Sequence, residues 1–163
     1  MYIRTFNKHV KQHYLNFNAV CIHKVVLKLY TDYKTLSDSL GADDLEDYFN
    51  NFLEQYSNKT KSLRALRQLY ELSYRQWNTY EVLAPEISKK ISEYIMSSIN
   101  FKSYDIMDTI ISIVENLFLE DVFEFIVSKK DIVTLESVRE LISEAEDEYS
   151  EAIHNPYCYP DVF

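Results

Sequence analysis

Glycine is almost absent from this sequence: its 163 residues include one glycine, Gly41, and three prolines. β-Sandwiches and doubly wound α/β sheets use both residues in their tight turns, so the scarcity argues against either fold. It also excludes the glycine-rich loops that hold phosphates in P-loop NTPases and in Rossmann dinucleotide enzymes. The composition instead favours helices joined by short polar loops.

Cysteine and catalytic motifs are equally scarce. Cys21 and Cys158 lie far apart in the sequence, which gives no sign of a disulfide framework. No Gly-x-Ser-x-Gly, His-Glu-x-x-His or Cys-x-x-Cys motif occurs, so we expect no enzymatic activity and no cofactor.

No apolar run has the length of a signal peptide or reaches the roughly 18 residues of a membrane span. We therefore expect a cytoplasmic protein that does not associate with membranes.

Positive charge is in short supply beyond the first 40 residues. The net charge is −9, made up of +4 in residues 1–40 and −13 in the remainder. An acidic body of this kind argues against direct binding to nucleic acid or to anionic membranes. The charge favours a basic protein partner, although ordinary solubility explains it as well.

Apolar residues are most concentrated between Ser103 and Ile132. A helix that is apolar on most sides is usually buried between its neighbours, so this stretch is the expected centre of the core. The acidic pair Glu120-Asp121 interrupts it and predicts two consecutive helices, 103–117 and 119–129. The residues expected to be most deeply buried are Ile110, Ile113 and Val114.

Apolar residues at steps of three and four predict six further helices. Gly41 is expected to end the second of these in a left-handed C-cap, and Asp43 and Glu46 fit a capping box for the third. Ser62 fits an N-cap, and Pro85 fits the first turn of a helix. The expected ranges are 2–17, 19–40, 43–56, 62–80, 84–99 and 133–152.

Aromatic residues supply much of the expected core, because the chain has 14 tyrosines and 9 phenylalanines. A tyrosine ring can be buried at a helix seam while its hydroxyl reaches solvent. On helix 62–80 we expect Tyr70, Tyr74 and Trp77 to face inward together with the leucines. On the last helix, Leu135 is expected on the inward side.

These patterns predict an all-α fold of about eight helices in a single domain, 1–163. Residues 1–60 form the N-terminal helices, 61–153 form helical hairpins, and 154–163 form an aromatic tail docked on the body. The helices fit an irregular bundle or a short HEAT-like α-solenoid, and the sequence leaves both arrangements open.

Metal binding is not expected. His9, His13, Cys21 and His23 offer zinc-type ligands, but their spacing matches no known ligand pattern. The acidic group 43–47 lacks the alternating ligands and the glycine of an EF-hand loop, and helix capping explains it more simply. His154 is expected at the surface.

The last helix is strongly acidic, with seven carboxylates opposing only Arg139. Crowded carboxylates repel one another and, late in a helix, oppose its macrodipole. A solvated outer face is one interpretation, and a docking surface for a basic partner, flanked by tyrosines of the tail, is the other. The residues predicted to bind that partner are Glu140, Glu144, Asp147, Glu148, Glu151, Tyr157 and Tyr159.

Three segments in the second half of the chain resemble HEAT-type helical hairpins: SYDIMDTIISIVENL, LEDVFEFIVSKKDI and VTLESVRELISEAEDEY. Small acidic proteins of this kind are similar to the helical-repeat immunity proteins of bacterial polymorphic toxin systems. The resemblance implies a non-enzymatic inhibitor that neutralises a cognate basic toxin, often a nuclease. Two alternatives stay open, namely a phage-encoded or host nucleic-acid mimic that inhibits a DNA-binding enzyme, and a structural adaptor.

Overall fold

The computed structural model describes residues 32–59, 61–150 and 152–154. These residues form α-helices and short 3-10 turns with no strand, which confirms the prediction of an all-α fold. The described part holds six α-helices, not eight, and predicted helix 2–17 and most of 19–40 lie outside it. The α-helices are α2 (Ala42–Tyr56), α3 (Leu63–Trp77), α4 (Pro85–Met96), α5 (Tyr104–Leu117), α6 (Glu120–Ser128) and α7 (Glu136–Tyr149). The 3-10 turns are η1 (Tyr33–Thr35), η2 (Lys130–Ile132) and η3 (Ala152–His154).

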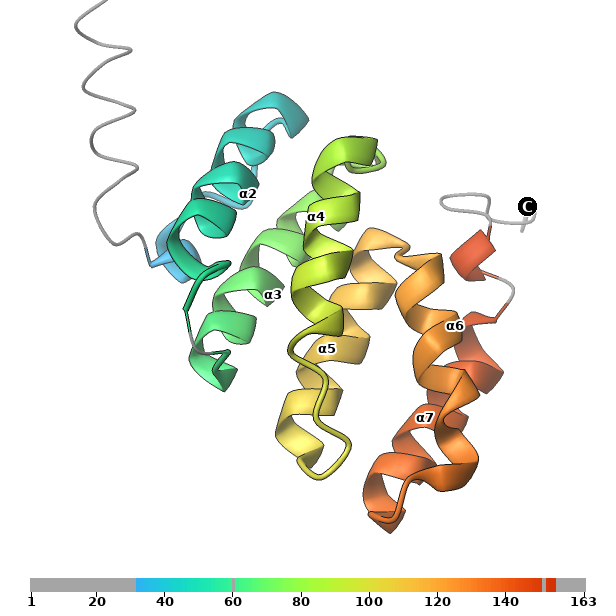
Figure 1. Cartoon of the computed structure of the whole chain (residues 1–163). Helices are drawn as coiled ribbons and strands as arrows, with labels where there is room; N and C mark the ends of the chain where they lie inside the picture. The colour runs from blue at the N-terminus through green and yellow to red at the C-terminus, as the bar shows by residue number, and fades with distance from the viewer. Residues whose placement is uncertain (1–31, 60, 151, 155–163) are drawn as a thin grey trace, which may run out of the picture. The chain divides into compact units, whose positions relative to one another are not determined.

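Two layers of helices make up the unit that begins at Tyr33. Figure 1 shows α2, α4 and α6 in one layer, with each packed against the next along the chain. Helices α3, α5 and α7 form the other layer, in which α3 packs along α5 and α5 against α7. None of the described helices has the length and apolar character needed to cross a membrane.

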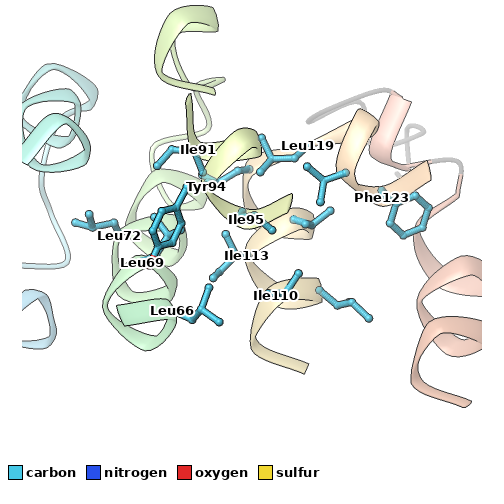
Figure 2. Packing of buried hydrophobic residues seen from close by; sticks show 14 of the residues in the cluster. Leu66, Leu69, Leu72, Ile91, Tyr94, Ile95, Ile110, Ile113, Leu119 and Phe123 are labelled. Carbon is cyan, nitrogen blue, oxygen red and sulfur yellow. The ribbon is translucent and has the colours of Figure 1, made fainter. Parts of the chain in front are cut away.

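The core lies between these layers, and the stretch singled out in the sequence is at its centre. Ile110, Ile113 and Val114 are completely buried, as predicted. Figure 2 shows Ile110 and Ile113 of α5 among leucines of α3 and the apolar residues Ile91 and Ile95 of α4. Burial of this many large apolar side chains is the main favourable contribution to folding.

Several helix ends follow the expected local rules. The Ser62 hydroxyl accepts a hydrogen bond from the Ala65 main-chain N–H at 3.3 Å, and Pro85 occupies the first helical position of α4. Helix α5 ends at Leu117, and Phe118 then adopts a left-handed conformation that lets α6 begin at Glu120. The two consecutive helices predicted around Glu120-Asp121 are therefore present.

The expected helix end at Leu40 and Gly41 is wrong. After η1 the chain is irregular up to Gly41, whose φ of −74° is not left-handed and which lies at the N-cap of α2. The cause is a set of tertiary contacts, because the Arg75 side chain binds main-chain oxygens of Leu36 and Ser37. These hydrogen bonds hold the segment in its irregular path beside α3.

The capping box predicted at Asp43 is also wrong, because Asp43 lies inside α2 and caps nothing. The side chains of Tyr70, Tyr74 and Leu135 were expected to face the core, but all three are exposed. On α3 the buried stripe follows Leu66, Leu69 and Leu72 instead. Because leucine is more apolar than tyrosine, the leucines occupy the core and rotate the tyrosines outward.

Candidate protein-binding face

The candidate face is the outer side of α3, α5 and α7. These helices run in the same direction, since Trp77 at the end of α3 stacks on Phe118 at the end of α5. Near the same end, Glu115 of α5 interacts with Glu148 and Tyr149 of α7. Side chains from three separate segments thus share one surface.

Four of the predicted partner-binding residues lie on this surface. Glu140, Glu144, Asp147 and Glu148 are all exposed on α7, on the side opposite the buried Val138 and Ile142. Glu151, Tyr157 and Tyr159 lie outside the described residues. The tail predicted to dock at 154–163 is likewise outside them, except for His154.

The charges of α7 are not evenly compensated. Arg139 pairs with Glu136, and Lys130 of η2 pairs with Glu146, so these two carboxylates have basic partners. Among the described residues, the other four acidic side chains of α7 form no ion pair. Two of these four still lie close enough to a cation to feel its charge, since Glu140 acts on Arg139 and Asp147 acts on Lys130. Glu148 is a neighbour of Glu115 on α5.

A shallow hollow of about 360 Å³ lies beside the uncompensated carboxylates. It has room for a side chain of a partner and carries both signs of charge, with acidic groups in the majority. The residues that line it are Lys130, Asp131, Glu136, Arg139, Glu140, Ser143 and Glu144.

Glu115 was not predicted and is the most perturbed carboxyl of this face. Its pKa is raised to about 7, first by burial and then by the neighbouring carboxylates of Glu148 and Asp108. The pKa of Tyr149 is also raised, first by burial and then by the charges of Glu115 and Glu148. A cationic side chain placed here would remove this repulsion and return Glu115 to its ionised form.

The sequence does contain a signal for Glu115. It lies between Val114 and Leu117 in the most apolar stretch of the chain, where an acidic residue cannot easily reach solvent. The exposed tyrosines Tyr70 and Tyr74 were missed for a different reason, namely that aromatic residues at helical spacing were assigned to the core. Their side chains are instead exposed on α3.

One group of side chains could in principle hold a metal ion. Within the described ranges, ligand atoms of Glu120, Glu124 and His154 lie within 4.8 Å of one another. All three side chains are exposed, and the contact of 2.8 Å between His154 Nδ1 and Glu120 Oε1 is that of a hydrogen bond at the surface. His154 thus lies at the surface, as predicted. The residues with zinc-type ligands near the N-terminus, His9, His13, Cys21 and His23, lie outside the described residues.

Comparisons with known protein families, with curated proteins and with solved structures find no match to this chain. Evidence for the function therefore comes from the surface of the chain.

Proposed function

We propose that this chain is a non-enzymatic inhibitor that binds a basic protein through the outer face of α5 and α7. The observation that carries the proposal is the group of four exposed carboxylates on α7 that form no ion pair, of which Glu148 is a neighbour of Glu115 on α5. Like charges this close are unfavourable in the free protein. A partner with Lys and Arg side chains at matching positions would relieve the repulsion on binding.

The order of helix contacts supports a HEAT-like arrangement of the part that begins with α2. Within each layer, every helix contacts the next one of that layer, as in stacked helical hairpins. Solenoid proteins use the surface formed by one layer of helices to bind their partners. The layer of α3, α5 and α7 would have that role here.

The partner that fits best is a basic toxin neutralised by a cognate immunity protein. Complementary charge raises association rates by steering the two proteins together, which benefits an inhibitor that must act before its target causes damage. The exposed rings of Tyr70 and Tyr74 add the amphipathic contact area that dominates many interfaces. The proposal places this encounter in the cytoplasm and involves neither direct nucleic-acid binding nor a membrane.

Affinity capture from the organism that encodes the chain tests this function. Wild-type protein and the double variant Glu144→Lys/Glu148→Lys are used as baits in parallel, and retained proteins are identified by mass spectrometry. We expect the wild type to retain one basic protein that the double variant loses. Recovery of no partner, or of an acidic one, would contradict the proposal.

A nucleic-acid mimic is the second candidate, because the carboxylates extend over two neighbouring helices and could imitate rows of phosphates. Asp108 and Glu115 of α5 continue the row on α7. The identity of the retained protein separates the two candidates. A toxin encoded beside this chain supports immunity, whereas a DNA-binding enzyme encoded elsewhere and released by duplex DNA supports mimicry.

A further inference from the structure

The loop between α3 and α4 contains a strained tyrosine. Tyr80 has a φ of 57°, in the left-handed region that bulky residues rarely adopt. Within the described part of the chain, Phe118 is the other non-glycine residue with a positive φ. Strained backbone of this kind persists only where surrounding contacts impose it, and it is concentrated at functional sites.

Contacts from the buried Gln76 impose the conformation of Tyr80. The Gln76 amide donates hydrogen bonds to the Glu81 main-chain oxygen at 2.8 Å and to the Thr79 hydroxyl at 3.3 Å. The Thr79 hydroxyl donates to the Gln76 main-chain oxygen at 2.7 Å and accepts from the Glu81 N–H at 3.1 Å. These four bonds fix the backbone on both sides of Tyr80.

The fixed loop presents two large side chains to solvent. Tyr80 is 68% exposed and Val82 is 60% exposed, while the next residue, Leu83, is buried and anchors the loop to the core. A rigid aromatic side chain loses little conformational entropy when it binds, which is why tyrosine is common at the centre of interfaces. A glycine would adopt this φ without strain.

The loop follows the end of α3 that is in contact with the end of α5. Trp77, three residues before Tyr80, stacks on Phe118 with ring centroids 5.5 Å apart. Phe118 in turn follows Glu115 by three residues, so both positions with positive φ and the half-buried carboxyl lie at or just beyond the C-terminal ends of α3 and α5. The Trp77–Phe118 stack thus links the loop of Tyr80 to the end of α5 that carries Glu115.

We infer that Tyr80 and Val82 form the apolar anchor of the docking surface, and that their occupant is a basic polypeptide segment with Lys or Arg beside an apolar side chain. This inference rests on the proposed function for the sign of the partner's charge. The tyrosine ring receives the cation over its face, and Val82 contacts the apolar neighbour. The acidic face then holds the remaining basic side chains of the same partner.

A random peptide library displayed on phage and selected on the full-length chain is a suitable probe. The inference predicts that selected peptides combine Lys or Arg with an aromatic or aliphatic residue. It also predicts that Tyr80→Ala weakens their binding at least about 30-fold, the effect of a typical hot spot. Tyr104→Ala is the matched control, because Tyr104 is 45% exposed at the opposite end of α5, and it should leave the affinity unchanged.

The melting temperature of a Tyr80 variant shows whether the ring is a binding anchor or stabilises the fold. Glycine adopts positive φ without strain, so Tyr80→Gly should melt at or above the wild-type temperature and still lose peptide binding. A fall in melting temperature of Tyr80→Gly would show that the ring serves the fold and would overturn the inference.

Five other outcomes have definite meanings. Selection of no peptides, or of peptides that bind Tyr80→Ala as well as wild type, overturns the inference. Selection of acidic or neutral peptides would contradict the assignment of a basic partner. A dimer that forms in sedimentation experiments and is lost in Tyr80→Ala would show that the occupant is a second copy of this chain. Basic peptides that need Tyr80 but tolerate Glu144→Lys/Glu148→Lys would support the anchor while counting against the proposed acidic face.

Discussion

The guanidinium of Arg75 donates a hydrogen bond of 2.8 Å to the main-chain oxygen of Leu36, 39 positions earlier in the sequence. Arg75 is only 3% exposed and also forms ion pairs with Asp38 and Glu71. Its remaining hydrogen bonds go to main-chain oxygens, which include that of Ser37 at 3.2 Å. One buried side chain thus holds the segment after η1 against α3.

Arg75→Met should destabilise the protein by about 2–4 kcal/mol, because it removes every donor while keeping an apolar stem. Urea unfolding measures the loss, and hydrogen exchange should show that the amides of η1 lose protection first. Arg67→Met on the same helix is the control, since Arg67 is exposed. Equal stability of the two variants would mean that Arg75 does not hold the segment.

Ile110→Asp should unfold or nearly unfold the protein, since a carboxylate without a partner would enter the centre of the core. The expected cost exceeds about 4 kcal/mol, the range of exceptional core substitutions. Ile132→Asp makes the same chemical change at a site that is 74% exposed and should cost almost nothing. Thermal melts followed by circular dichroism compare the two, and an unchanged melting temperature of Ile110→Asp would contradict the assigned core.

Glu115→Gln should remove a pH dependence of stability near neutrality. The folded-state pKa of Glu115 is raised from 4.5 to about 7, so the native state holds this proton more tightly than the unfolded state. Its contribution is fully present below pH 4.5 and is lost as the pH rises to about 7. Glu115→Gln should thus match wild type near pH 5.

At pH 8, Glu115→Gln should be more stable than wild type by roughly 1–2 kcal/mol. This is less than the whole pKa shift implies, because the carboxyl is partly exposed to solvent. Glu144→Gln on the exposed side of α7 is the matched control and should change stability little at either pH. Denaturant unfolding at the two pH values tests the difference, and a constant gap between wild type and Glu115→Gln would contradict it.

How much the sequence reveals depends on the range of the interactions involved. Burial of Ile110 and the cap at Ser62 follow from neighbours within a few residues, and both were predictable. The irregular segment before Gly41 was not predictable, because it depends on contacts with Arg75 that no local sequence pattern indicates. Glu115 is intermediate: its place in the most apolar stretch indicates the burial that chiefly raises its pKa, whereas the further rise caused by the Glu148 carboxylate of α7 depends on the packing of two helices.

Some exposed residues of the candidate face were likewise predictable from the sequence, and others were not. The acidic side of α7 followed from helical periodicity, and four of its predicted residues are indeed exposed. The outward position of Tyr74 depends on how leucine and tyrosine compete for one core, which spacing alone does not decide. The anchor at Tyr80 depends on a backbone conformation imposed by the buried Gln76.

The most direct test of the central claim is the association rate of the captured basic partner, measured against salt concentration. Glu144→Lys/Glu148→Lys should slow association at low salt at least about tenfold and weaken its salt dependence, while the melting temperature changes little. The control Glu86→Lys/Glu93→Lys reverses the same number of exposed charges on α4, in the other helix layer, and should have a much smaller effect. If Glu144→Lys/Glu148→Lys binds at the wild-type rate at low salt, or slows association no more than the control, the partner does not dock on the acidic face of α7.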